Sequence, residues 1–289
     1  MRISSMPAPE DGSNMNPAEA FRQRWRNRDL SAMISVHRGL WNPAPENSLA
    51  SIAAAAPFGI IEIDAQMTAD GVPVVVHDPD LKRTAGVNLI PQQTDHAILT
   101  AQRLRAGFGG PEADWSDQFI PTLEQALKAV GSEAYFDIDV KNPNEVDAVA
   151  SALAHQGLGD KGSLKIATRA ASDIEALLAL QERSGAMVMA KVTLPDAGLD
   201  HIKALVDAGV GAVELWFDDL DQLAQACTLA GDDMAISTYT LDPVHCCGIS
   251  DAKALQDPDQ TWGRLLDAGI SIIMTDQAVA LQRYLTQRA

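Results

Sequence analysis

The segment IIEIDAQ, residues 60–66, decides the fold of this chain. Side chains of a β-strand point alternately to opposite faces, so the apolar residues share one face while Glu62 and Asp64 share the other. The segment YFDIDVK, residues 135–141, repeats this alternation and ends in a lysine. If both strands belong to one barrel, four carboxylates and an ammonium point into the same mouth.

Carboxylates can crowd in this way only when their charge is compensated. Two carboxylates about 4 Å apart repel each other by roughly 4 kcal/mol at the dielectric constant of a protein surface. Such a cluster persists only with a cation among the acids or with several protons taken up. We expect a cation.

The composition excludes several classes of partner. The 289 residues carry a net charge of −17, which argues against nucleic acid and anionic membranes, because binding to either depends on neutralising phosphates. An anionic substrate would therefore need a local positive site. Three cysteines form no disulfide framework, and no segment reaches the ~20 apolar residues of a membrane span. We expect a cytoplasmic protein with no membrane or nucleic-acid partner.

Strand-like and helix-like segments alternate from residue 31 onward. The expected strands are 33–37, 60–66, 73–77, 134–140, 164–168, 187–192, 211–216, 234–239 and 271–275. This alternation indicates right-handed βαβ units and a parallel sheet. An Asp-Gly pair at 70–71 joins 60–66 to 73–77, which is typical of a hairpin and cannot connect parallel neighbours. We therefore predict an α/β fold, a (βα)8 TIM barrel, with 73–77 as an added arm and 80–120 as a long excursion after the second strand.

The domain organisation follows from the same pass along the chain. Residues 1–30 are expected to form a mobile leader that ends in a short helix, and residues 31–289 a single barrel domain. Among the helix starts, Thr122 with Gln125 resembles a capping box, and Asn144 and Ser172 are further candidates for N-caps.

Two histidines end apolar strands. His37 closes the first strand and His77 closes the arm. Active sites of such barrels lie at the C-terminal ends of the strands, so both can join the acidic cluster as an acid–base pair. Taken singly, each is more often a hydrogen-bonded structural residue, and that alternative stays open.

Six short motifs follow one another in a fixed order. They are HRG (37–39), PENS (45–48), EID (62–64), TADG (68–71), PVVVHD (73–78) and RTAG (83–86), with IPTL (120–123), DVK (139–141) and, more weakly, TD (275–276) after them. In order and spacing they resemble the glycerophosphodiester phosphodiesterase family, over roughly residues 33–280. The resemblance implies a βα barrel with an excursion after strand two, which agrees with the strand count.

The resemblance also implies roles for the matching residues. His37 and His77 match the family's acid–base pair, and Glu62, Asp64 and Asp139 match its ligands for one divalent cation. Hard carboxylate oxygens suit Mg²⁺ or Ca²⁺ rather than a soft metal.

Four more residues match the phosphate-binding part of the family's site. Arg38 and Lys141 correspond to the groups that hold the phosphate, and Glu46 and Asn47 to a motif that lines the same pocket. Such cations beside a metal would neutralise a phosphodiester and the extra charge of its transition state. They would supply the local positive site that a chain of charge −17 needs.

The chain departs from the family at the third metal ligand, Asp139, where glutamate is usual, and at residues 239–241, where a Trp-Thr pair is common. The second departure lies where the alcohol portions of a substrate should sit. Further candidates for substrate contacts are Arg169, Lys191, Trp216 and Tyr239. Solvation of the cations and core packing of the aromatics are the alternatives.

Three hypotheses follow from the sequence. The first is metal-dependent hydrolysis of a small-molecule phosphodiester, a glycerophosphodiester or a related sugar phosphodiester. The second is a lyase, similar to sphingomyelinase D, that stops at a cyclic phosphate. The third is a barrel without activity that binds a phosphorylated metabolite. The sequence leaves the two alcohols, the choice between Mg²⁺ and Ca²⁺, and the oligomeric state open.

Overall fold

The structure is a computed structural model and describes residues 32–131 and 134–288. The leader and helix expected in residues 1–30 lie outside the described residues. The strands are β1 (Met33–Val36), β2 (Gly59–Met67), β3 (Pro73–Val75), β4 (Arg103–Arg105), β5 (Trp115–Phe119), β6 (Tyr135–Val140), β7 (Gly162–Ala167), β8 (Met187–Thr193), β9 (Ala212–Trp216), β10 (Ala235–Tyr239) and β11 (Ile272–Thr275).

The helices separate most of these strands. The α-helices are α2 (Leu49–Ala55), α3 (Lys82–Ala85), α4 (His96–Leu99), α5 (Leu123–Lys128), α6 (Val146–Gln156), α7 (Ala171–Ser184), α8 (Leu194–Asp207), α9 (Leu220–Ala230), α10 (Asp251–Ala254), α11 (Arg264–Ala268) and α12 (Ala278–Arg288). The short turns are η1 (Ala56–Phe58), η2 (Pro91–Gln93), η3 (Pro143–Glu145), η4 (Gly159–Lys161) and the π-helical η5 (Asp259–Gly263). Among the described residues, every helix is too short or too polar to cross a membrane.

Eight parallel strands form the predicted barrel. The sheet order is β1-β11-β10-β9-β8-β7-β6-β2-β3, and β1 also pairs with β2, which closes the barrel. The ninth strand, β3, runs antiparallel to β2 with Val75 opposite Ala65. The turn between them contains Gly71 at φ +79°, a conformation that glycine adopts without strain. Both the eight-strand barrel and the added arm are therefore confirmed.

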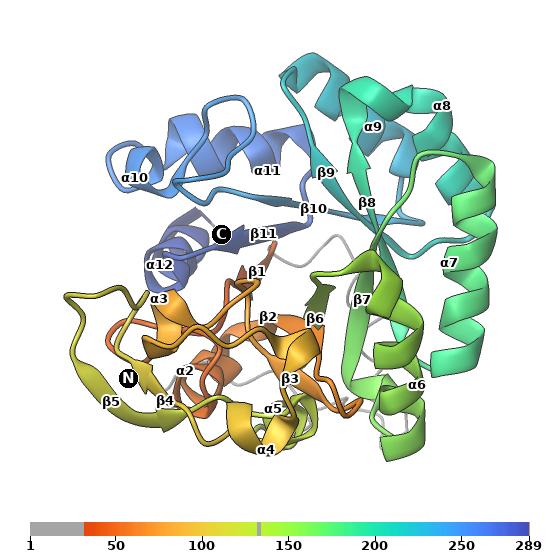
Figure 1. Cartoon of the computed structure of the whole chain (residues 1–289). Coiled ribbons are helices and arrows are strands. Elements are labelled where there is room, and N and C mark those ends of the chain that lie inside the picture. Colours follow the sequence, from red (N-terminus) through yellow and green to blue (C-terminus); the bar gives the residue numbers. More distant parts are fainter. Residues whose placement is uncertain (1–31, 132–133, 289) are drawn as a thin grey trace, which may run out of the picture. The chain divides into compact units, whose positions relative to one another are not determined.

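The described residues fall into two compact units. The first contains His37–Leu164 and Arg183–Ala186, and the second contains Lys165–Glu182 together with the described residues 32–36 and 187–288. In the first unit β2 pairs with β6, and Figure 1 shows these two strands side by side. The single domain expected for residues 31–289 stays a prediction.

Both faces of β2 are buried, whereas a strand at the protein surface buries only its apolar face. Ile61 and Ile63 are fully buried, as their apolar side chains require, but Glu62 and Asp64 are also buried, at 2% and 0% exposure. The parallel register sets Asp64 opposite Asp139 on β6. Acidic side chains of two neighbouring strands thus meet, with Glu62 and Asp64 buried and Asp139 partly exposed.

The excursion after β3 has a hydrophobic core of its own. It contains α3, η2, α4 and the two antiparallel strands β4 and β5. Its core residues are Val74, Val76, Leu81, Ala85, Leu99, Leu104 and Ile120. Full burial of a leucine such as Leu99 contributes roughly 1.5–3 kcal/mol. The excursion is therefore a packed structure that holds the residues after the arm in place.

Helix starts agree only in part with the sequence pattern. Thr122 and Gln125 form the predicted capping box of α5. The prediction for Asn144 is wrong, because Pro143 can occupy the first turn and Asn142 is the residue whose side chain accepts from a backbone N–H. The prediction for Ser172 is also wrong, because α7 already begins at Ala171.

Candidate active site

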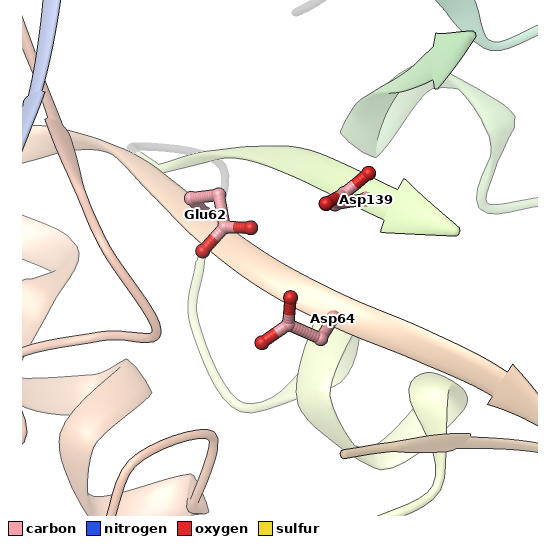
Figure 2. A group of neighbouring side chains, drawn as sticks. All are labelled: Glu62, Asp64 and Asp139. Atoms are coloured by element: carbon pink, nitrogen blue, oxygen red, sulfur yellow. The ribbon is translucent and has the colours of Figure 1, made fainter. Parts of the chain in front are cut away.

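Three carboxylates from the two central strands of the first unit converge. Glu62 and Asp64 on β2 and Asp139 on β6 each offer one oxygen, and these oxygens lie within 4.8 Å of one another. Figure 2 shows the three side chains on the two neighbouring strands. The fourth acid of the sequence pattern, Asp137, is buried and accepts a hydrogen bond from Ser163 Oγ at 3.4 Å. The grouping expected from the strand pattern is therefore present for three acids.

Two cations compensate this charge. Lys141 Nζ lies 2.5 Å from Asp64 Oδ1 and 2.7 Å from Asp139 Oδ2. Arg38 Nε lies 3.2 Å from Asp64 Oδ2. Burial alone would raise the pKa of Asp64, but Lys141 and Arg38 outweigh it and hold that pKa below its usual value. Burial alone would lower the pKa of Lys141, and Asp64 and Asp139 raise it instead. Asp64, Lys141 and Arg38 are consequently charged near neutral pH.

The donor set fits a divalent cation. Carboxylate oxygens are the ligands that hard divalent ions prefer. Asp64 Oδ1 is buried and lies 2.5 Å from the Lys141 ammonium, a contact that occupies one of its two lone pairs. A lone pair of this oxygen therefore remains available within the carboxylate cluster. The three acids form a possible metal site.

The loop after β1 orients two of the three acids. The backbone N–H of Arg38 donates to Glu62 Oε2 at 3.0 Å, and Asn47 Nδ2 donates to Asp64 Oδ2 at 2.7 Å. Arg38 and Asn47 both have positive φ angles, 54° and 57°, a strained conformation in residues other than glycine. The adjacent Gly39 packs so closely that a Cβ would lie 2.7 Å from the backbone of Ser51. The HRG and PENS motifs thus hold the acids at fixed positions.

The remaining phosphate-motif residue, Glu46, is occupied by arginines. Its carboxylate is 3% exposed and lies 3.2 Å from Arg38 NH1. It also accepts two hydrogen bonds from Arg83, which neutralise it further. Glu46 therefore holds the Arg38 guanidinium by a hydrogen bond. Contact of Glu46 with a substrate stays a prediction.

Both candidate histidines belong to the first unit. His37 follows β1 and is buried. His77 follows β3, and its Nδ1 lies 2.8 Å from Asp78 Oδ1. Burial alone would raise the pKa of Asp78, but hydrogen bonds from His77 and Arg83 hold it far below its usual value. Asp78 is therefore an anion, and it accepts a hydrogen bond from the N–H at His77 Nδ1.

The buried side-chain amide of Gln66 binds the backbone around His77. Gln66 on β2 is 3% exposed. Its Nε2 donates to the carbonyl oxygens of Val76, His77 and Asp78 at 3.0, 3.1 and 2.8 Å. One side chain thus ties the end of the arm to the strand that bears Glu62 and Asp64.

The other candidates lie in the second unit, near the C-terminal ends of β7 to β10. Lys191, Trp216 and Tyr239 are half-buried, and Arg169 is exposed. Burial raises the pKa of the Tyr239 hydroxyl, so it stays protonated and can donate a hydrogen bond. Contact of these four residues with a substrate stays a prediction.

Three residues of the described site had no role in the sequence analysis. Asp78 and Arg83 belong to motifs that were recognised, yet nothing in their spacing assigned a function. The signal for them is an acid next to a candidate histidine and an arginine five residues later, a pattern typical of a supporting ion pair. Gln66 could have been found as a polar residue on the acidic face of β2.

The fold and the site together define a class of protein: a (βα)8 barrel with a possible site for a divalent cation. The profile of the glycerophosphoryl diester phosphodiesterase family matches residues 37–280. The chain belongs to this family, whose members are phosphoric diester hydrolases. The resemblance inferred from the six motifs is confirmed.

Individual relatives agree with this assignment. A glycerophosphodiester phosphodiesterase of Bacillus subtilis is 33% identical over 138 residues, which is 43% of this chain and 46% of that protein. The chain thus spans about half the length of this curated relative. A solved structure of a glycerophosphoryl diester phosphodiesterase from Parabacteroides distasonis has a TM-score of 0.74 at 18% identity, over 94% of this chain and 92% of that one.

A second solved structure is an Oleispira antarctica phosphodiesterase in complex with the product sn-glycerol-3-phosphate. It has a TM-score of 0.65 at 20% identity and covers 93% of this chain and 99% of that one. At such identities the two solved structures show the fold that this chain shares.

Proposed function

We propose that this protein hydrolyses a small phosphodiester to an alcohol and a phosphomonoester, with one divalent cation, Mg²⁺ or Ca²⁺. The observation that carries the proposal is the cluster of three carboxylate oxygens within 4.8 Å, flanked by Arg38 and Lys141. The acids of this site would bind the divalent cation, and its two basic residues would bind an anionic substrate. Family membership supports the same reaction class.

Each charged residue has a proposed task. Glu62, Asp64 and Asp139 would hold the cation, which supplies charge neutralisation to the phosphoryl oxygens when it is bound. The Arg38 guanidinium can present two N–H groups to a phosphate, and the Lys141 ammonium adds a compact positive charge. Because Asp64 and Asp139 keep Lys141 protonated, this charge persists well above neutral pH.

The two histidines supply the proton transfers. One imidazole, His37 or His77, takes the proton of the attacking oxygen as the new P–O bond forms. The other imidazole, in its protonated state, gives a proton to the leaving alkoxide as the old P–O bond breaks. Overall one proton passes from the nucleophile to the leaving group, and the two histidines end with their protonation states exchanged. The attacking oxygen belongs to water, or to a substrate hydroxyl if a cyclic phosphate forms first.

The substrate class is a glycerophosphodiester or a related sugar phosphodiester. The related Oleispira antarctica protein binds sn-glycerol-3-phosphate as its product, which supports the glycerol class. Contact of Arg169, Lys191, Trp216 and Tyr239 with the alcohol portion of the substrate stays a prediction. The net charge of −17 favours a small diester over nucleic acid. A cytoplasmic location stays a prediction.

The test is phosphorus NMR of the full chain with several soluble diesters, with Mg²⁺ or Ca²⁺ and after chelation. We expect a phosphomonoester product that disappears on chelation and in the variants His37→Ala and His77→Ala. His155→Ala, on the exposed face of α6, is the matched control and should keep wild-type turnover. Absence of turnover with every diester would sink the proposal. A persistent cyclic phosphate would establish the lyase instead.

A further inference from the structure

Arg83 belongs to the RTAG motif, yet the proposed reaction gives it no task. Its guanidinium donates to both oxygens of Glu46, from NH1 to Oε2 at 2.8 Å and from NH2 to Oε1 at 2.6 Å. It also donates to both oxygens of Asp78, from Nε to Oδ2 at 2.7 Å and from NH2 to Oδ1 at 3.0 Å. One planar guanidinium therefore joins two carboxylates, a task for which arginine is suited and lysine is not.

Each of these two carboxylates contacts a proposed active-site residue. Asp78 Oδ1 lies 2.8 Å from His77 Nδ1, and the Glu46 oxygens lie 3.2 and 3.3 Å from Arg38 NH1. Glu46, Arg83 and Asp78 together are called the bridge below. The bridge connects a proton-transfer residue at one end to a phosphate-binding residue at the other. Its charges alternate in sign from residue to residue, so each contact is attractive.

The surroundings keep Arg83 in place. The carbonyl oxygen of Phe108 accepts a hydrogen bond from Arg83 NH1, and the Phe108 ring centroid lies 4.1 Å from the guanidinium carbon. A Cβ at Gly109 would lie 2.6 Å from the carbonyl oxygen of Arg83, so the loop approaches closely here. Burial alone would lower the pKa of Arg83, but Glu46 and Asp78 raise it instead. The guanidinium is thus permanently charged and fixed on three sides.

We propose that Arg83 is a positioning residue of the phosphodiester site, which acts through Asp78 on His77 and through Glu46 on Arg38. The proposal rests on the proposed function for the tasks of His77 and Arg38. Asp78 accepts a hydrogen bond from the N–H at His77 Nδ1, so Nε2 is the atom that exchanges a proton with a substrate oxygen while the Nδ1 proton stays in place. Glu46 holds the Arg38 guanidinium through its two contacts with NH1 at 3.2 and 3.3 Å.

The kinetic test compares Arg83→Lys and Arg83→Gln with the control Arg103→Gln, an exposed arginine on β4 that donates to a backbone oxygen. We expect kcat/KM to fall about 100-fold in both Arg83 variants, the typical cost of a misplaced catalytic group, and to stay unchanged in the control. Calorimetric affinity for Ca²⁺ alone should change far less than kcat/KM, because Lys141 and Asn47 still hold Asp64 and Lys141 still holds Asp139.

The two ends of the bridge predict different kinetic effects. Asp78→Asn should lower kcat, because an amide can favour the wrong imidazole tautomer. Glu46→Gln should raise KM, because Arg38 loses its charged partner. If the bridge acts as a unit, Arg83→Lys adds little to a chain that already carries both changes. Full additivity of the three changes would overturn the proposal.

A readout independent of turnover is the ¹⁵N NMR spectrum of His77 at about pH 9, where an imidazole is neutral. Wild type should show a protonated Nδ1, and Arg83→Gln a mixture of tautomers. Folded Arg83 variants with a wild-type tautomer and wild-type kinetics would refute the positioning role. If wild type turns over no diester, the proposed function fails, and the tautomer of His77 still decides whether the bridge positions it. If Arg83→Gln does not fold, Arg83→Lys, which keeps the charge, carries the comparison.

Discussion

Asp251 offers a quantitative prediction of stability as a function of pH. The residue is 1% exposed and joins the ends of two barrel strands in the second unit. Its Oδ1 accepts hydrogen bonds from Thr240 Oγ1 at 2.5 Å and Thr275 Oγ1 at 2.6 Å, and its Oδ2 accepts from the N–H of Asp276 at 2.8 Å. Burial outweighs these donors and raises the pKa of Asp251 from 3.8 to about 6.

The sign and the size of the effect follow from linkage. A carboxyl with a raised pKa binds its proton more tightly in the folded state, so stability falls as pH rises from 3.8 through about 6. Each pKa unit corresponds to about 1.36 kcal/mol. The interval from 3.8 to about 6 therefore gives a loss of about 3 kcal/mol, complete by about pH 7.

The assay is urea unfolding followed by tryptophan fluorescence, between about pH 4 and about pH 7, for wild type and Asp251→Asn. The variant cannot titrate at this position, so the wild-type free energy of unfolding minus that of the variant should fall by about 2 kcal/mol across this range, the rest of the loss lying below about pH 4. Asp233→Asn, at an exposed turn residue, is the matched control and should give a flat difference. A flat or rising difference for Asp251→Asn would show that the carboxyl is not desolvated as described.

Three further predictions concern the first unit. Asp139→Asn should weaken calorimetric binding of Mg²⁺ or Ca²⁺ by at least about tenfold, roughly 1.4 kcal/mol, because one of three carboxylates is lost; an unchanged Kd contradicts the metal site. Lys141→Met should raise KM for the diester. Because the raised pKa of Lys141 keeps its ammonium charged, the wild-type KM should not increase up to about pH 10. An increase of KM at lower pH speaks against a contact between this ammonium and the substrate. Gln66→Leu should lower the free energy of unfolding by about 1–3 kcal/mol and reduce kcat, because three carbonyls around His77 lose their donor; a fully stable and active variant contradicts that support.

Local periodicity explains why the barrel could be predicted. The alternation in residues 60–66 and 135–141 depends only on neighbouring residues, and it placed Glu62, Asp64 and Asp139 on the same face of two adjacent strands. The Asp-Gly turn likewise specified the antiparallel arm.

Contacts between distant side chains could not be predicted in this way. Glu46 and Arg83 are 37 positions apart, and no hydrophobic period encodes their pairing. The core of the excursion is formed by single apolar residues in short elements, which resemble an irregular loop in sequence. The N-cap predicted at Asn144 failed because a proline shifted the helix start, an effect of one neighbour on another's backbone.

The hairpin of β2 and β3 has a mechanical consequence. Val76 N–H donates to the backbone oxygen of Asp64 at 3.0 Å, so a metal-ligand candidate and the residue before His77 are rungs of the same ladder. A register slip of the arm by one residue would turn the side chains of the arm to the opposite face, away from the acids of β2. The spacing between the carboxylate of Asp64 and the imidazole of His77 is thereby constrained by backbone pairing as well as by side-chain contacts.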